Sequence, residues 1–286
     1  MKRLIVVFFL SVTILFSLSC KPSIAADPLM VFCGAAFKRP MEDITKLYQQ
    51  RTGGRVDVAY GNLSMLLSQI LLSRQGDVLV APSPEIMERA LEKKVVESES
   101  IRNIAYLVPT INTRKGNPKN ISGLKDLARP GIRVGLANPE IVYIGAVAAE
   151  IIENNLSGDE KIALQQNIVT YVEDFNKLAT LIVLNHVDAI IGMHFLEGWY
   201  PDKVSTVKLK PAEVSRIGSA QAAVVTHTAK KAMAGSFIDF LASDEVRAIF
   251  RKYHYFGTTQ EAFSWVGEAV PVKENVAPAK GGRTGR

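Results

Sequence analysis

The sequence predicts an α/β protein of two lobes, each a mixed, mostly parallel sheet flanked by helices. Short β-branched runs alternate with helix-length amphipathic segments in two successive series. A helical segment near the C-terminus follows the second series. With both ends of the chain set aside, about 240 residues remain, which is enough for two lobes of ordinary size.

The first series predicts the sheet and helices of the first lobe. Its elements are a strand at 28–33, a helix from 37 to 48 closing at Gly53-Gly54, a strand at 55–60, a helix at 64–73, a strand at 77–81 and a helix at 84–94. Pro84 stands at the start of the last helix, where its missing N–H costs nothing. This order of elements is typical of a parallel sheet covered by helices.

The second series predicts the other lobe and a return to the first. Its elements are a strand at 104–111, a loop at 116–118, a helix at 123–128, a strand at 133–136, helices at 145–154 and 174–185, strands at 189–192 and 220–226, and two helices within 236–253. Ser243 separates these last two helices as an N-cap. Ligands of such sheets bind beyond the carboxyl ends of the strands, in the cleft between lobes.

The N-terminus has the layout of a secretory signal peptide. Lys2 and Arg3 precede an uncharged apolar run at 4–18, and the small residues at 23–26 offer a cleavage site after Ala25 or Ala26. The predicted product is a soluble periplasmic protein. A lipid anchor at Cys20 stays open as an alternative, although Ser17 stands where a lipoprotein signal prefers a large aliphatic residue.

The basic charge of the chain comes from its two ends. The net charge is +6, of which three charges lie in the leader 1–26 and three in the tail 269–286. The body is therefore near neutral, which disfavours nucleic-acid binding. The tail has no periodicity and is predicted to be disordered.

The predicted domain bounds follow from these elements. Lobe 1 comprises residues 27–108 and 217–268, and lobe 2 comprises residues 109–216. Two extended segments cross between the lobes, at Val108-Pro109 and near 217–219. We expect these crossings to act as hinges that close when an anion contacts both lobes.

Four loops are candidates for the ligand site, at 33–36, 60–64, 137–140 and 173–175. The first two combine small residues with a turn that leads directly into a helix. Free N–H groups at a helix N-terminus, together with the helix dipole, hold an anion without a cationic side chain. A structural interpretation is also open, because small residues suit such turns for geometric reasons alone. Asn62 and Ser64 are then helix caps, and Phe175 and Met193 are core residues.

Six stretches of the chain carry a recognisable pattern in order: 31–44, 60–70, 76–79, 138–145, 173–175 and 249–253. Together they resemble the periplasmic molybdate-binding proteins of ABC transporters. The resemblance covers roughly residues 29–256. It implies a type II periplasmic binding protein, with a tetrahedral oxyanion such as molybdate or tungstate held between two closing lobes by hydrogen bonds.

The resemblance also implies where the ligand contacts lie. They fall at Ala36, Leu63, Ile144, Phe175 and Met193. Typical members have serines at the first two positions and an aromatic donor at the last, so three side-chain donors are missing here. Four neighbouring residues complete the candidate set and include side chains that can compensate: Ala35, Asn62, Ser64 and Tyr143.

The resemblance implies a monomeric receptor that passes its oxyanion to an ABC permease in the inner membrane, with no cofactor. The archaeal tungstate and molybdate group adds two carboxylate ligands, but the aligned positions here hold Val142 and either Met193 or His194. We therefore expect no coordination by protein side chains. His194 is a lone histidine after a predicted buried strand. Such a histidine more often has a structural role than a ligand-binding or pH-sensing one.

Three other classes of function compete with this one. No GxSxG, GxGxxG, Walker or HExxH pattern occurs, and the four histidines share no spacing, so an enzyme is not expected. A receptor for sulfate, phosphate, thiosulfate or an organic acid stays open, because the serine donors are missing. For phosphate, Glu140 or Asp174 can accept the ligand's proton if it faces the cleft. A signalling module built on the same fold is a third alternative.

Overall fold

The structure is a computed structural model that describes residues 27–273, apart from the side chains of Leu63 and Ser64. The predicted signal peptide, Cys20 and the tail from Glu274 lie outside the described residues. Among the described helices, none has both the length and the apolar character needed to cross a membrane.

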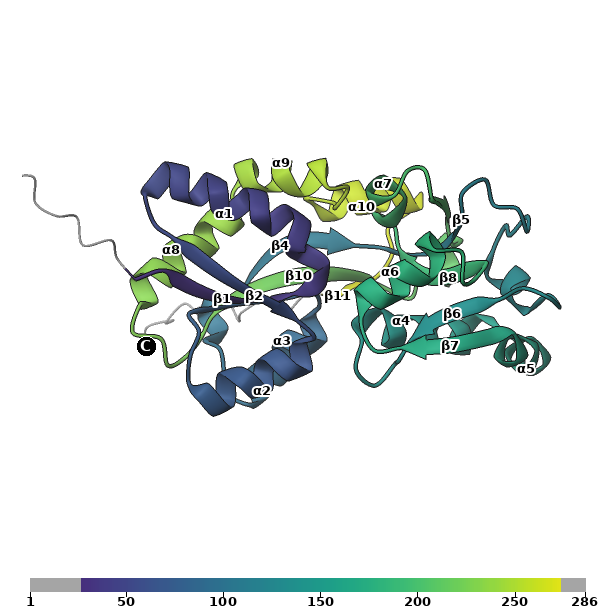
Figure 1. Ribbon diagram of the computed structural model, residues 1–286, viewed down its shortest axis with the longest axis horizontal. Helices are drawn as coiled ribbons and strands as arrows, with labels where there is room; N and C mark the ends of the chain where they lie inside the picture. Colours follow the sequence, from purple (N-terminus) through teal and green to yellow (C-terminus); the bar gives the residue numbers. More distant parts are fainter. Residues whose placement is uncertain (1–26, 274–286) are drawn as a thin grey trace, which may run out of the picture.

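Two sheets divide the described chain into two lobes (Figure 1). The first sheet has the order β11-β10-β3-β1-β2, with β4 also paired to β10, and we call it and its helices lobe 1. Its strands are β1 (Leu29–Gly34), β2 (Val56–Gly61), β3 (Val78–Ala81), β4 (Arg102–Leu107), β10 (Ile217–Val224) and β11 (Val272–Lys273). β1 pairs in parallel with β2 and β3, whereas β10 runs antiparallel to β3 and β4.

The second sheet has the order β7-β6-β8-β5-β9 and defines lobe 2. Its strands are β5 (Pro109–Arg114), β6 (Val134–Ala137), β7 (Ile168–Val172), β8 (Ala189–Met193) and β9 (Val204–Val207). β6 is parallel to β7 and β8, and β5 is antiparallel to β8 and β9. The predicted fold class, two lobes with mixed sheets and flanking helices, is therefore confirmed.

Helices cover both sheets. Those of lobe 1 are α1 (Lys38–Thr52), α2 (Leu63–Ser73), α3 (Pro84–Glu92), α8 (Lys231–Leu241), α9 (Asp244–Lys252) and α10 (Thr259–Val266), and a 3₁₀ turn η1 (Ala35–Phe37) precedes α1. Those of lobe 2 are α4 (Tyr143–Asn155), α5 (Gly158–Asn167), α6 (Phe175–Val183) and α7 (Leu196–Trp199). Ser243 caps α9 by accepting from the Val246 N–H, as predicted.

The structure corrects the expectation of one strand at 104–111. The chain forms β4, leaves the first sheet at Val108 and enters the second sheet as β5. The apolar run continues through this crossing because both strands are buried in their own sheets. Hydrophobicity alone therefore gives no sign of the change of lobe.

Several elements were not predicted. Residues 158–172 form α5 and β7, residues 196–207 form α7 and β9, and residues 259–266 form α10. The expectation of disorder from Ala269 onward is wrong for the end of the described chain, because β11 pairs with the start of β10. Residues 217–219, expected to be a crossing, are part of β10, so the chain enters the first sheet at Ile217.

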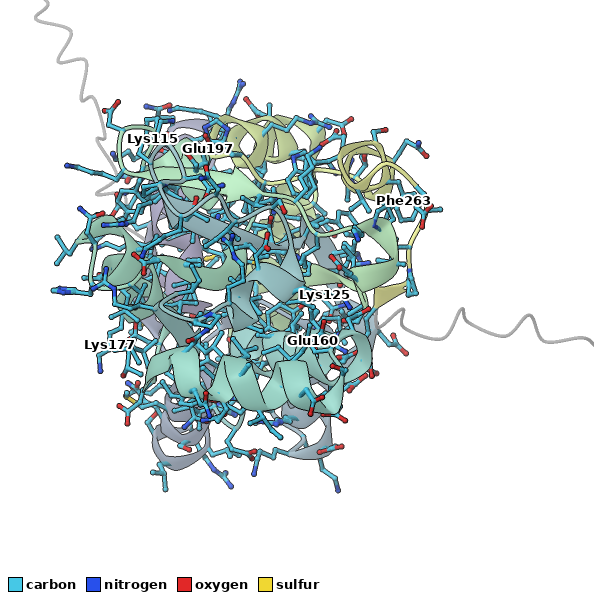
Figure 2. The ribbon with its side chains drawn as sticks, turned by 90° about the vertical axis from the view of Figure 1, so that its right-hand side faces the viewer. Lys115, Lys125, Glu160, Lys177, Glu197 and Phe263 are labelled. Atoms are coloured by element: carbon cyan, nitrogen blue, oxygen red, sulfur yellow. The ribbon has the colours of Figure 1, made fainter. Side chains whose placement is uncertain are left out.

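One apolar core runs through both lobes. It joins residues of β1 and α1 in lobe 1 to residues of β8, α4 and α6 in lobe 2. A second, smaller core lies under α2 and α3. Charged pairs such as Lys125–Glu160, 2.9 Å apart, lie at the outer end of lobe 2 (Figure 2).

Candidate ligand pocket between the lobes

A pocket of about 80 Å³ lies where turns of both lobes meet. Lobe 1 contributes the turn after β1, the turn after β2, the start of α3 and the end of β4. Lobe 2 contributes the starts of α4 and α6 and the end of β8. The lining residues are Gly34, Ala35, Ala36, Gly61, Asn62, Pro82, Ile86, Leu107, Ile141, Val142, Tyr143, Ile144, Asp174, Phe175, Met193 and Phe195.

The pocket brings together seven of the nine residues expected at the site. These are Ala35, Ala36, Asn62, Tyr143, Ile144, Phe175 and Met193. The other two, Leu63 and Ser64, begin α2 next to Asn62, and their side chains lie outside the described part of the chain. Sequence reasoning missed Pro82, Ile86, Leu107 and Phe195 as pocket residues.

Backbone amides of both lobes are free at the pocket. The N–H groups of Ala36, Ile144 and Phe175 have no acceptor within the described residues. They lie in the first turns of η1, α4 and α6, where the helix has no earlier carbonyl to offer them. The helix dipoles of α4 and α6 add positive potential at the same place. The arrangement suits an anion.

Gly145 determines how closely α4 approaches the loop after β6. A Cβ at this position would lie 2.5 Å from the carbonyl oxygen of Asn138 and 2.6 Å from that of Ala137. Only glycine therefore allows α4 to begin this close to the loop, with Tyr143 and Ile144 at the pocket.

Among the described residues that line the pocket, none has a cationic side chain. The ionisable residues among them are Asp174 and Tyr143. The Asp174 carboxylate accepts from the Lys177 N–H at 2.8 Å and so caps α6, while Glu140 does not line the pocket. Burial raises the pKa of Tyr143, and the nearby Glu85 carboxylate adds to this rise, so its phenol stays protonated.

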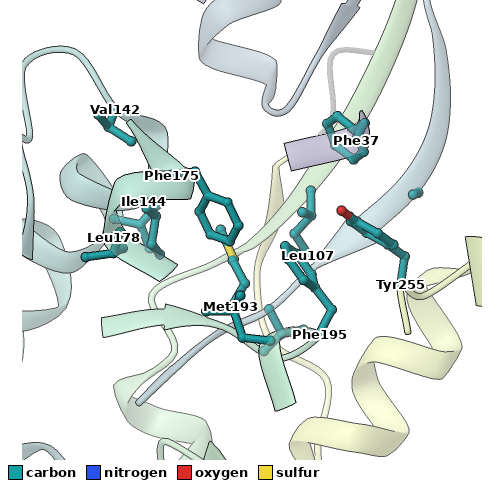
Figure 3. Packing of buried hydrophobic residues seen from close by; sticks show 14 of the residues in the cluster. Phe37, Leu107, Val142, Ile144, Phe175, Leu178, Met193, Phe195 and Tyr255 are labelled. Carbon is teal, nitrogen blue, oxygen red and sulfur yellow. The ribbon is translucent and has the colours of Figure 1, made fainter. Parts of the chain in front are cut away.

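Apolar side chains form most of the pocket wall. Figure 3 shows the ring of Phe175 beside Met193, with Leu107 and Phe195 on the neighbouring side. Phe175 and Phe195 have ring centroids 5.5 Å apart. The side chains of Ala36 and Met193 offer no hydroxyl or N–H donor, so at these two positions a hydrogen bond to a ligand must come from the backbone.

Asn62 links the lobes at the pocket. Its side-chain amide, in lobe 1, donates to the backbone oxygen of Glu173 at 3.3 Å and to that of Ile141 at 3.5 Å, both in lobe 2. Asn62 therefore connects the turn after β2 to two of the turns that hold the free amides.

The family described as bacterial extracellular solute-binding protein matches residues 29–256, which is most of the chain. The chain belongs to this family. It is therefore a solute-binding protein of the kind that serves ABC transporters.

A curated relative and several solved structures agree with the family. A Haemophilus influenzae protein described only as a binding protein is 29% identical over 169 residues, or 59% of this chain and 67% of that protein. The molybdate-binding protein of Azotobacter vinelandii is similar in structure at a TM-score of 0.67 and 18% identity, covering 79% of this chain and 98% of that one.

Two further structures show how varied the ligands of this fold are. The sulfate-binding protein SubI of Mycobacterium tuberculosis has a TM-score of 0.72 and 17% identity, covering 86% and 93% of the two chains. PEB3 of Campylobacter jejuni, solved with bound L-phospholactate, has a TM-score of 0.69 and 22% identity, covering 80% and 100%. At these identities the likeness establishes the fold, and the ligand of this solute-binding protein is a separate question.

His194 lies behind the pocket and does not line it. Its ring stacks on Phe256 with centroids 4.2 Å apart, and its Nδ1 lies 3.2 Å from the Val108 N–H at the crossing between β4 and β5. The Val108 carbonyl already accepts from the His194 N–H, so we assign Nδ1 as the acceptor for the Val108 N–H. His194 thus ties the end of β8 to this crossing.

Burial makes His194 a source of acid sensitivity. Desolvation lowers the pKa of His194 to about 3, whereas an unfolded histidine titrates near 6.5. As the pH falls, the unfolded state therefore takes up a proton before the folded state does. The contribution of His194 to the free energy of unfolding is present above about pH 6.5 and is lost as the pH falls below it. Between pH 7 and pH 5 we expect a loss of about 2 kcal/mol in the free energy of unfolding.

Urea unfolding at several pH values measures this loss. His194→Gln should show a shallower fall between pH 7 and pH 5 than the wild type, and His227→Gln, at an exposed position, should match the wild type. Equal slopes for His194→Gln and the wild type would contradict the assignment of a buried neutral imidazole.

Proposed function

We propose that this protein is the periplasmic receptor of an ABC importer and binds a tetrahedral oxyanion, molybdate or tungstate, in the pocket between its lobes. It works as a monomer, without a cofactor and without metal coordination by its side chains, and passes the anion to a permease in the inner membrane. Nucleic acid and enzymatic turnover have no part in this function. The free amides of Ala36, Ile144 and Phe175 are the observation that supports it.

An anion held in this way favours closed lobes. Ala36 lies in lobe 1, whereas Ile144 and Phe175 lie in lobe 2, so only the closed arrangement offers all three donors to one ligand. We place lobe 1 at residues 27–108 and 217–268 and lobe 2 at residues 109–216, with the hinges at Val108 and next to Ile217. Because the ligand has more contacts in the closed state, binding shifts the population toward it.

A second candidate ligand is another small anion, above all one with an organic part. The apolar wall around Met193 and Phe195 favours it, because an apolar group contacts such a wall at no cost in hydrogen bonds. A bare dianion would leave any oxygen that faces this wall without a partner.

Titration calorimetry with molybdate, tungstate, sulfate, phosphate and phospholactate separates the two candidates. We expect molybdate or tungstate to bind at micromolar or tighter Kd. If phospholactate binds and none of the inorganic anions does, the ligand is an organic anion. An absence of heat with every anion would reject an anion receptor of either kind.

Adding one hydroxyl to the pocket should strengthen oxyanion binding. Ala36→Ser places a donor beside a free amide, and a hydrogen bond to a charged acceptor contributes about 1.5–3 kcal/mol. We expect the Kd for molybdate to fall about tenfold, measured by calorimetry. Ala149→Ser, at an exposed site on α4, should leave the Kd unchanged. A larger Kd for Ala36→Ser than for the wild type would show that the ligand's oxygens do not reach η1.

A further inference from the structure

A cluster of charged side chains lies at the crossing just before β10. The Arg216 guanidinium lies between two carboxylates, with its Nη2 at 3.2 Å from Glu85 Oε1 and its Nη1 paired with Glu150. Lys273 of β11 adds ion pairs of 3.4 Å to Glu85 and to Glu88. We call these five residues the crossing cluster.

The crossing cluster joins the two lobes through one ion pair. Arg216 is the last residue of the crossing into β10, and its guanidinium is held on the lobe 1 side by Glu85 of α3, a helix that packs on β10. Glu150 lies on α4 of lobe 2. The side chains of Arg216 and Glu150 are 19% and 34% exposed, so water screens their attraction only partly.

Tyr143 connects the crossing cluster to the pocket. Its ring lines the pocket, while its hydroxyl is buried against Gly218, where no Cβ would fit. This hydroxyl lies beside Arg216, and after burial its pKa is raised by Glu85 and Glu150 and lowered by Arg216. Tyr143 and Glu150 are both on α4, so the ion pair acts on the same helix that presents the free Ile144 amide.

Other charges nearby do not replace this connection. Lys273 and Glu88 both belong to lobe 1, and Glu153, one turn after Glu150, pairs with Lys161 inside lobe 2 at 2.8 Å. Asn62 also joins the lobes, but by a neutral hydrogen bond at the turn after β2.

We propose that the Arg216–Glu150 ion pair is a clasp that holds α4 against lobe 1 and so positions the start of α4 for ligand binding. Separation of the lobes would move Glu150 away with α4 and leave Arg216 with Glu85. The clasp therefore favours the closed arrangement before any ligand arrives. Glu150 and Arg216 are positioning residues, since neither lines the pocket.

Two matched variants on one helix test the clasp. Glu150→Gln keeps the size of the side chain and removes its charge, and Glu153→Gln does the same at the ion pair within lobe 2. Small-angle scattering of the unliganded protein should show a larger radius of gyration for Glu150→Gln and no change for Glu153→Gln. Calorimetry with sodium molybdate should show about tenfold weaker binding for Glu150→Gln alone, the effect expected of a modest coupling energy.

The outcomes distinguish the clasp from the proposed ligand. If Glu150→Gln matches Glu153→Gln in both measurements, the clasp is rejected. If no variant binds molybdate, the proposed ligand fails, and the radius of gyration alone decides the clasp. Arg216→Gln should reproduce the effects of Glu150→Gln and replaces it if that variant does not fold.

Discussion

Ala36→Asp should abolish anion binding. The new carboxylate would lie in a pocket whose described lining residues include no cationic side chain, and it would repel an anionic ligand at close range. It can also accept the free amide hydrogens in place of the ligand. We expect the Kd for molybdate to rise at least about a hundredfold, a loss of about 3 kcal/mol, measured by calorimetry.

Ala36→Asn separates charge from size in this experiment. Asparagine has nearly the same volume as aspartate and no charge, so its effect should stay within about tenfold of the wild type. Equal losses for both variants would indicate steric exclusion and would weaken the case for an anion. Retained affinity in Ala36→Asp would place the ligand away from η1.

The sequence could predict the turns that form the pocket, because local chemistry marks them. Gly34 and Gly61 end their strands, a helix start follows each of them, and in lobe 2 the N-cap Asp174 precedes α6 in the same way. Parallel strands place such turns at one edge of a sheet, so residues distant in sequence could be assigned to one site.

The apolar wall of the pocket could not be predicted in this way. Leu107 and Ile86 belong to segments that are buried whether or not they face a ligand, so their hydrophobicity carries no separate signal. The Arg216–Glu150 pair also has no local pattern, because the fold alone brings its two partners together.

Some missed elements did have a signal. Ser157 and Glu160 form a capping box at the start of α5, a pattern readable in the sequence. The split between β4 and β5 had none, since both strands are buried and Val108 between them is equally apolar. Local patterns thus mark the ends of elements better than they mark a change of sheet.

Phe195 lies at the centre of the aromatic cluster that joins the lobes. It is fully buried, and its ring centroid lies 4.5 Å from that of Tyr255 in lobe 1 and 4.6 Å from that of Trp199 in lobe 2. It also lines the pocket beside Phe175. Its removal therefore acts on stability, on the contact between lobes and on the ligand site together.

Phe195→Ala should lower the free energy of unfolding by about 3–5 kcal/mol, the usual range for a buried phenylalanine. Phe237 is the matched control, because it is equally buried but packs on Tyr48 within lobe 1. Phe237→Ala should cost a similar amount in urea unfolding and leave the Kd for a bound anion unchanged, whereas Phe195→Ala should also weaken binding. If both variants bind as the wild type does, the aromatic contact between the lobes does not support the closed pocket. A loss of affinity in Phe195→Ala alone would show that this contact and the free amides act on the same closed state.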